Sequence, residues 1–479
     1  MEKKYKPTWN SLKRHRTPEW LDDAKFGIYF HWGIYSVPEF GSEWYPHNMY
    51  IGGPVYNFHA EKFGEPDEFG YKDFIPDFTA EHFDAKKWAT LFKETGAKFA
   101  GPVAEHHDGF SMWNSKVNKW NAYKMGPKRD IVGELEKAIK NEGMKFITTF
   151  HHAHNWYYFY HLQGLDTADP QYAGLYGKPH SAVNNVGTSG PKHDRPDVEF
   201  CEFWFAKLRE VIDKYTPDLI WFDFGLMRIP DKYKRQMAAY YYNAALDWDR
   251  EVEIIYKRHH MPPQVGLLDY ERGRSDQLTW HKWITDTSIG KKSWSYVANE
   301  EYKTADVLIH NFLDRIAKNG YLLLNFGPKA NGIIPEDAVK CMKKIGDWIR
   351  VNREAIFNST SWVLAEEGPT IMQKSGGFSE QNEVSYTAED LRFVVKNNAL
   401  YAFILGIPDK HILIRSLTLS PDPPILKDYY LIENSDIASI HLLGYDEELK
   451  WKLTNKGLNI ELPAEKPCEH ALTIKIAWT

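Results

Sequence analysis

The sequence predicts an α/β protein in which a TIM-like (β/α) barrel is followed by an all-β sandwich domain. Over roughly the first 350 residues, apolar runs of strand length alternate with helical patterns, which is typical of βα units and a parallel sheet. About seven or eight such units in a segment of this length suit a barrel with long loops. Beyond it, short strand patterns separated by turns favour a sandwich. We therefore expect a barrel-like domain at 1–355 and a β-sandwich domain at 356–479.

The barrel strands are predicted from apolar runs that follow a turn or a helical pattern. Helical patterns extend over 80–96, 131–142, 198–215 and 335–352. The predicted strands are 26–30, 98–103, 144–150, 218–222, 252–256, 266–268 and 321–325. The stretch 182–190 is rich in Gly, Ser and Asn, so we expect a long loop there.

The C-terminal part lacks a helical pattern after residue 352. Apolar and polar residues alternate with a period of two at 391–395 and 472–478, as expected of half-buried strands. The strands predicted here are 391–395, 399–405, 411–417, 439–443, 449–453, 458–462 and 472–478.

Composition narrows the function classes. The 479 residues include 59 Lys and Arg against 65 Asp and Glu, a formal net charge of −6, which argues against a general nucleic-acid binder. Only three cysteines occur, far apart in the chain, which excludes a disulfide framework and a CxxC zinc site. Aromatic residues make up 15% of the chain, a surplus that suits stacking on sugar rings, stacking on bases or core packing.

The chain contains no apolar stretch of the roughly 18 residues that a membrane span requires. The first ten residues are polar and lack the apolar segment of a signal peptide. The compartment therefore stays open, and a periplasmic or extracellular location is expected if a signal peptide was removed.

Polar and aromatic residues follow the predicted strands, where a parallel barrel carries its active site. Two chemistries can use such a set. Glycoside hydrolysis needs two carboxylates, with aromatic and histidine side chains around the sugar. Metal-assisted hydrolysis would draw on His106, His107, His151, His152 and Asp223, although the His-x-x-x-His spacing of zinc proteases is absent.

Four segments resemble the α-L-fucosidases of glycoside hydrolase family 29. They are FHWGIYSVP at 30–38 with EWY at 43–45, EHHDGF at 105–110, IWFD at 220–223 and LLLNFGP at 322–328. The segments span the predicted barrel in the family's order, and a C-terminal β-sandwich is also the family pattern. The resemblance implies a retaining exo-α-L-fucosidase that removes terminal α-L-fucosyl residues from oligo- or polysaccharides without a cofactor or metal.

The resemblance also implies roles for single residues. Asp223 matches the nucleophile. The alternative to this catalytic role is that Asp223 only caps the helix that follows it. Glu271 is our choice for the acid/base, with Glu300 or Glu301 second; the latter two look like the start of a helix. The alternative to the acid/base role is that Glu271 only forms a surface ion pair with Arg272, Arg274 or Lys282.

A further set matches positions that contact the sugar. The residues are His31, Glu43, Trp44, His106, His107, His151 and Arg258. Two positions depart from the family, because Phe150 and His151 stand where a Tyr is frequent, and Lys257 and Arg258 only approximate the Arg beyond the fifth strand. The extra basic residues suit an anionic substrate such as a sulfated fucan. The alternatives are a non-catalytic fucose-binding protein on a barrel scaffold and a metal-dependent hydrolase.

Overall fold

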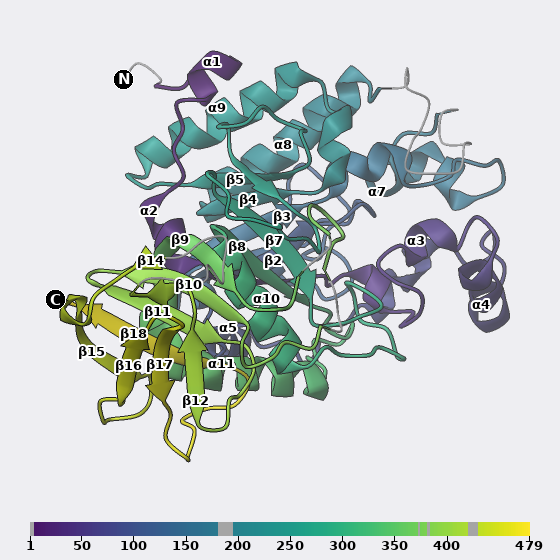
Figure 1. The fold of residues 1–479 in the computed structure, drawn as a ribbon. Coiled ribbons are helices and arrows are strands. Elements are labelled where there is room, and N and C mark those ends of the chain that lie inside the picture. Colours follow the sequence, from purple (N-terminus) through teal and green to yellow (C-terminus); the bar gives the residue numbers. More distant parts are fainter. Residues whose placement is uncertain (1–3, 181–194, 372–373, 381–383, 420–429) are drawn as a thin grey trace.

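The computed structural model describes residues 4–180, 195–371, 374–380, 384–419 and 430–479. Eight parallel strands close into a barrel in chain order (Figure 1). They are β1 (Phe26–Phe30), β2 (Phe99–Glu105), β3 (Lys145–Phe150), β4 (Leu219–Phe222), β5 (Glu253–Lys257), β6 (Leu267–Asp269), β7 (Trp283–Ser288) and β8 (Gly320–Phe326). The predicted barrel followed by β-sheets is confirmed. The predicted loop 182–190 lies outside the described residues.

The barrel strand β7 is absent from the strands that the apolar runs of the sequence predict. The sequence of β7, WITDTS, is half polar, yet all six residues are buried. Several of the polar groups have partners inside the fold: the Tyr29 hydroxyl donates to Asp286 Oδ2 at 2.8 Å, and Thr285 Oγ1 donates to the Tyr270 carbonyl at 2.6 Å. Asp286 Oδ1 is buried without a hydrogen-bond partner among the described residues. Buried polar groups with such partners do not destabilise a strand, although they hide it from a hydrophobicity pattern.

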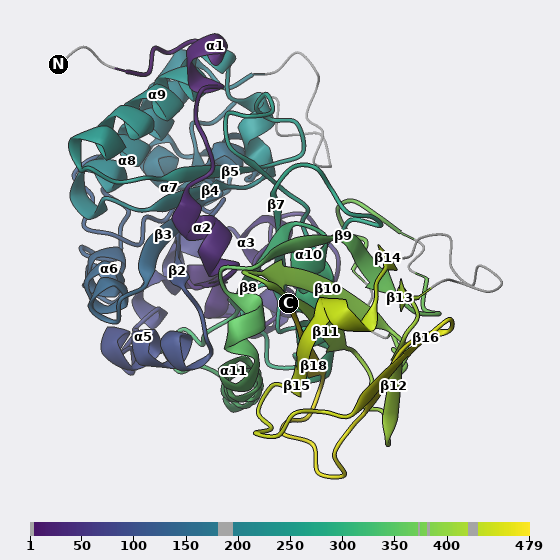
Figure 2. The same cartoon turned by 60° about the vertical axis from the view of Figure 1, so that its left-hand side comes forward.

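The barrel interior is a packed core below the mouth. Side chains from alternate positions of the strands fill it, among them Tyr29, Val103, Trp221, Ile255 and Leu323. The short helix α2 (Glu19–Ala24) adds Leu21 to this core and lies across one end of the barrel (Figure 2). Because the interior is filled, the chemistry must lie at the carboxyl ends of the strands.

Helices cover the barrel unevenly. The main ones are α5 (Ala85–Glu94), α6 (Ile131–Asn141), α8 (Val198–Tyr215), α9 (Asp231–Asp247), α10 (Ala305–Ala317) and α11 (Glu336–Ile356). The connections 258–266 and 270–282, which the structure describes in full, contain no helix. The strands β5, β6 and β7 are therefore joined by loops alone, and no helix of these connections covers this part of the barrel wall.

The C-terminal domain consists of two antiparallel sheets packed over one core and a small parallel pair of strands. A five-stranded sheet has the order β15-β18-β11-β10-β9, and a three-stranded sheet has the order β12-β17-β16. The strands are β9 (Thr360–Glu367), β10 (Leu391–Lys396), β11 (Ala399–Ile404), β12 (His411–Ile414), β15 (Ile437–Leu442), β16 (Trp451–Thr454), β17 (Gly457–Glu461) and β18 (Leu472–Trp478), with a small pair β13 (Leu417–Thr418) and β14 (Tyr430–Leu431). The strand β9 was not predicted.

The five-stranded sheet lies against α10 and α11 of the barrel (Figures 1 and 2). Buried ion pairs join the two domains: Arg392 Nε of β10 lies 2.7 Å from Asp314 Oδ1 of α10. Glu380 reaches from the C-terminal domain to Lys303, with 2.7 Å between the carboxylate and the ammonium. None of the helices in the described parts of the chain is both long and apolar enough to cross a membrane.

Candidate active site

Asp223 directly follows β4 at the barrel mouth and is 5% exposed. Its carboxylate does not cap the short helix η7 (Phe224–Arg228) that it precedes. Instead, Oδ1 lies 2.8 Å from Lys257 Nζ, and Oδ2 lies 3.1 Å from His107 Nε2 and 3.3 Å from His151 Nδ1. The side chain is therefore held in the mouth by one cation and two imidazoles.

Lys257, the last residue of β5, joins the two predicted catalytic carboxylates. Its Nζ lies 2.8 Å from Asp223 Oδ1 and 2.8 Å from Glu271 Oε2. These two oxygens are consequently separated by at most twice that distance, about 5.6 Å. The ammonium also lies 4.7 Å from the centre of the Trp221 ring and 3.9 Å from Asp286 Oδ2. A single buried cation thus sets the spacing of the acidic groups.

The two carboxyl groups have opposite protonation tendencies. Burial alone would raise the pKa of Asp223, but the Lys257 charge and the hydrogen bonds from His107 and His151 hold that pKa well below its usual range. Burial and, to a smaller extent, the nearby charges of Asp286 and Asp223 together raise the pKa of Glu271 to about 7, against the opposing effect of Lys257. One group is ionised and the other can carry a proton near neutral pH, as a nucleophile and an acid require.

The residues considered as ion-pair partners of Glu271, and the second-choice acids Glu300 and Glu301, make contacts elsewhere. Among the described residues, Lys282 pairs with Asp22 at 2.8 Å and Arg274 lies 3.7 Å from Asp314, so neither forms the surface ion pair with Glu271. The expectation that Glu300 and Glu301 begin a helix is wrong, because α10 begins at Ala305. Glu300 accepts hydrogen bonds from the backbone of Lys292 and Ser293, and exposed Glu301 pairs with Lys292. Local backbone donors explain these acids without a helix.

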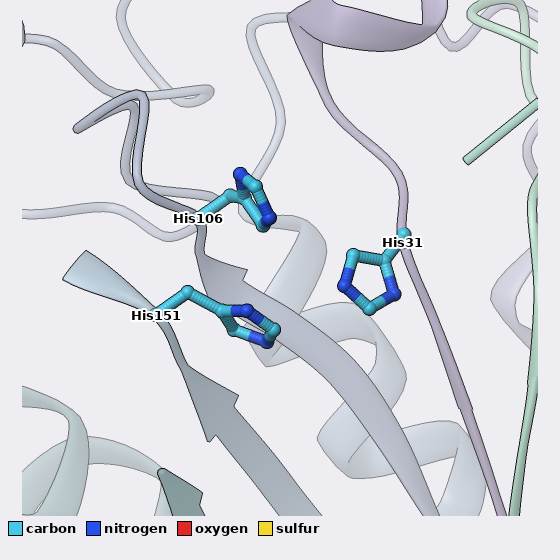
Figure 3. Close-up of side chains that lie close together, drawn as sticks. All are labelled: His31, His106 and His151. Atoms are coloured by element: carbon cyan, nitrogen blue, oxygen red, sulfur yellow. The ribbon is translucent and has the colours of Figure 1, made fainter. Parts of the chain in front are cut away.

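Three buried histidines from different strand ends converge (Figure 3), and one of them, His151, contacts Asp223. They are His31 after β1, His106 after β2 and His151 after β3. His31 Nδ1 lies 2.8 Å from Asn325 Oδ1 of β8, which fixes its ring. Burial lowers the pKa of each of these imidazoles, to about 4 for His151. The neutral rings present nitrogens that can bind hydroxyl groups.

The adjacent pair His106 and His107 lies beyond the end of β2, so the strict alternation of a strand does not apply to it. His107 Nδ1 contacts the His151 carbonyl at 2.6 Å, which directs its other nitrogen to Asp223. The preceding Glu105 is anchored by a buried ion pair with Lys207 and accepts from Ser111 Oγ at 2.6 Å. These anchors hold the loop after β2 against the site.

Trp44 and Glu43 lie on the loop that follows β1. The Trp44 ring is partly buried, stacked at 6.2 Å on Phe224 and 5.5 Å from the His107 ring. Glu43 Oε2 accepts from the Trp294 backbone at 3.1 Å and lies 3.4 Å from Ser293 Oγ, so it joins this loop to the one after β7. Burial raises the pKa of Glu43.

Some functional residues differ from those that the sequence indicated. Arg258 is exposed and has a left-handed backbone (φ 53°), whereas Lys257 lies between the carboxylates. The sequence left either Lys257 or Arg258 for this role. Because Ile255 belongs to the barrel core and side chains two positions apart on a strand share a face, the strand pattern favours Lys257. Trp294, whose ring lies 5.6 Å from that of His31, gave no signal because it comes from an irregular loop.

Two sets of side chains in the described chain are close enough to hold a metal ion. One is His31, His106 and His151; the other is His107, His151 and Asp223. Imidazole nitrogens of this kind suit Zn²⁺. The ammonium of Lys257, however, already lies 2.8 Å from Asp223, and its charge would repel a second cation there.

Comparisons with known proteins show the family to which the chain belongs. The α-L-fucosidase family profile matches residues 1–354, and that of the α-L-fucosidase C-terminal domain matches residues 380–477. Tissue α-L-fucosidase of Bos taurus is 31% identical, with 99% of this chain and 90% of the relative covered. The corresponding Homo sapiens enzyme is 30% identical, with 100% and 91% covered.

A solved structure extends the similarity to three dimensions. The Thermotoga maritima α-fucosidase in complex with fucose superposes with a TM-score of 0.75 at 28% identity, and 99% of this chain and 100% of that chain are covered. Both domains and nearly the whole length are thus matched. The chain belongs to the α-L-fucosidase family of glycoside hydrolases.

Proposed function

We propose that this α-L-fucosidase is a retaining exo-enzyme that uses Asp223 as nucleophile and Glu271 as acid/base. The observation that carries the proposal is the bridge formed by Lys257, which limits the two carboxylate oxygens to about 5.6 Å. Retaining glycosidases have carboxyl groups roughly 5–5.5 Å apart, whereas inverting enzymes separate them by roughly 6.5–9.5 Å to admit a water. The substrate is a terminal α-L-fucosyl residue of an oligo- or polysaccharide.

In the first step, Asp223 attacks the anomeric carbon while Glu271 gives its proton to the leaving oxygen. The ionised state of Asp223 follows from Lys257 and the two imidazoles, which hold its pKa well below the usual range despite burial. Burial keeps the pKa of Glu271 at about 7, so a substantial fraction is protonated at neutral pH. The product is a fucosyl-enzyme ester on Asp223 and a released alcohol.

In the second step, Glu271 takes a proton from water, and the water oxygen attacks the anomeric carbon from the face that the leaving group vacated. The bond to Asp223 breaks, and fucose is released with the configuration of the substrate. Glu271 regains its proton and Asp223 its charge, so the enzyme returns to its starting state.

The histidine cluster supports recognition of the sugar. His31, His106 and His151 are buried, and their rings converge (Figure 3), with His151 Nδ1 3.3 Å from Asp223 Oδ2. Their neutral nitrogens can exchange hydrogen bonds with sugar hydroxyls, and Trp44 offers an apolar face to the fucose ring and methyl group. A sugar lacking a hydroxyl would leave a buried nitrogen unpaired, which opposes its binding.

A sulfated fucan is a more specific candidate substrate, and the charges around the site bear on where its sulfate could bind. Lys257 already pairs with Asp223 and Glu271, and burial lowers the pKa of His31, His106 and His151. Exposed Arg258 is the group that supports an anionic substrate, and it lies outside the histidine cluster. We therefore propose that sulfate is accepted on the leaving group rather than on the cleaved fucose. A fucoside sulfated on the cleaved ring should react at least about tenfold more slowly than its unsulfated form; equal turnover would contradict this placement.

The decisive experiment follows the anomer released from an aryl α-L-fucoside by NMR. Initial appearance of α-L-fucose supports the retaining mechanism, and initial appearance of β-L-fucose would overturn it. A second arm adds a chelator: unchanged turnover is expected, and loss restored by Zn²⁺ would favour the metal-dependent alternative. Binding of fucose without any turnover would favour the non-catalytic alternative.

A further inference from the structure

A cavity of about 450 Å³ lies beside Glu271, in the part of the barrel wall that no helix of the connections 258–266 and 270–282 covers. Three chain segments line it: the loop after β5, the loop after β6 and a loop of the C-terminal domain. The lining residues are Lys257, Arg258, His259, Leu268, Asp269, Tyr270, Glu271, Gly377 and Phe378. The proposed acid/base and its lysine partner thus belong to the wall of this cavity, which the histidine cluster does not line.

Phe378 is the aromatic side chain that the C-terminal domain contributes to the cavity, and it is 63% exposed. Its ring leaves apolar surface free at the cavity, and a sugar ring packed on it would remove that surface from water. Its backbone is nevertheless held firmly: the Phe378 N–H donates to the Glu271 carbonyl at 2.6 Å, and the Glu380 N–H donates to the Arg272 carbonyl at 2.7 Å. The loop is therefore fixed against the Glu271 backbone, and the Phe378 side chain lines the cavity from there.

Charged anchors hold the same loop. The Glu380 carboxylate is buried, with Lys303 Nζ at 2.7 Å and Thr287 Oγ1 at 2.6 Å, so the loop is tied to α10 and β7. Phe378 adopts a left-handed backbone (φ 56°), which is rare for an aromatic residue. Such costly conformations persist where the surroundings enforce them, and they cluster at ligand clamps.

We propose that Phe378 is a stacking platform for the sugar ring of the leaving group. The inference rests on the proposed function, in which Glu271 protonates the leaving oxygen. The leaving group must therefore lie on the Glu271 side of the mouth, where Phe378 is the exposed aromatic side chain of the cavity. A pyranose ring offers an apolar C–H face to an aromatic ring, and its hydroxyls can meet Arg258 and His259. The C-terminal domain thereby takes part in substrate selection.

The test compares two substrates that share the fucosyl group but differ in the leaving group. One is a fucosylated disaccharide, and the other is α-L-fucosyl fluoride, which places no sugar against Phe378. For Phe378→Ala, kcat/KM should fall by about tenfold on the disaccharide and by less than about twofold on the fluoride. Phe378→Tyr should restore the disaccharide rate. Tyr430→Ala removes another exposed aromatic side chain of the same domain and should change neither rate.

The outcomes separate this inference from the proposed function. An equal loss on both substrates would mean that Phe378 supports the Glu271 loop only, and no loss on either would mean that the leaving group lies elsewhere; both results overturn the inference. If the wild-type enzyme releases β-L-fucose first from the fluoride, the proposed mechanism fails, whatever the Phe378 variants do.

Discussion

The two sides of the barrel mouth differ in closure and in charge. On the side of β1–β3, His31, His106 and His151 are buried, and burial lowers the pKa of all three. On the side of β5–β7, Lys257 and Glu271 border a cavity that no helix covers in the described connections. The closed side suits the fucosyl group, which is constant, and the open side suits a leaving group that varies. Asp223 lies between them, at the end of β4.

The largest effect is expected from removing the Asp223 carboxylate, which lies between the two sides of the mouth. Asp223→Gly should lower kcat by about a thousandfold or more, because the covalent step loses its nucleophile. Azide should restore turnover and give the β-fucosyl azide, since the small anion occupies the vacated space and attacks directly. The NMR configuration of the product is the readout. Near-normal hydrolysis without azide would show that another group is the nucleophile.

Glu271→Ala tests the open side. On a fucosylated disaccharide, kcat should fall by about a thousandfold, and less on an aryl fucoside, whose leaving group needs little protonation. In the wild-type enzyme, kcat/KM should decline as the pH rises through about 7, because Glu271 loses its proton there. This alkaline decline should vanish in the variant. Azide should yield the α-fucosyl azide, since it attacks the intermediate; a β-product would contradict the acid/base role.

Lys257→Met tests the link between the two sides. The loss of the ammonium should lower kcat/KM by about a hundredfold, because Asp223 loses its cation. Lys257 lowers the pKa of both carboxyl groups, so both values should rise in its absence. The pH–rate profile should therefore move to higher pH on both limbs. Lys257→Arg is the matched control, and its profile should stay near that of the wild type. An unmoved profile for Lys257→Met would exclude the electrostatic role.

His106→Ala tests the closed side. We expect kcat/KM to fall by about tenfold through loss of a hydroxyl contact. The loss should be the same for fucosyl fluoride and for a disaccharide, since both place the same sugar among the histidines. A loss confined to the disaccharide would break the assignment of the fucosyl group to this side.

Arg258→Ala should have the smallest effect. The side chain is exposed and its backbone turns away after β5, so kcat/KM on neutral fucosides should change by less than about twofold. A substrate with a sulfated leaving group should lose more. A large loss of kcat/KM on neutral substrates would instead indicate that Arg258 contacts the fucosyl group.

Much of the fold and part of the site follow from local patterns. Apolar runs revealed seven barrel strands, and the residues after them included Asp223, His31, His106 and His151. The apolar pattern did not reveal β7 because its buried Asp286 and Thr285 are polar; Asp286 accepts from Tyr29 of β1, and Thr285 donates to the Tyr270 carbonyl. Glu300 and Glu301 resembled a helix start because acids favour that position. The three-dimensional fold instead gives Glu300 the backbone donors of a neighbouring turn.

The sequence by itself determined which side chains stand at the strand ends, because strand ends and their motifs are local. Only the tertiary structure decided which neighbours they acquire. Lys257 lies between Asp223 and Glu271 because the closed barrel brings the ends of three strands together, and this contact and burial set opposite pKa shifts. Phe378 reaches Glu271 from another domain, over a separation along the chain that no local pattern can encode.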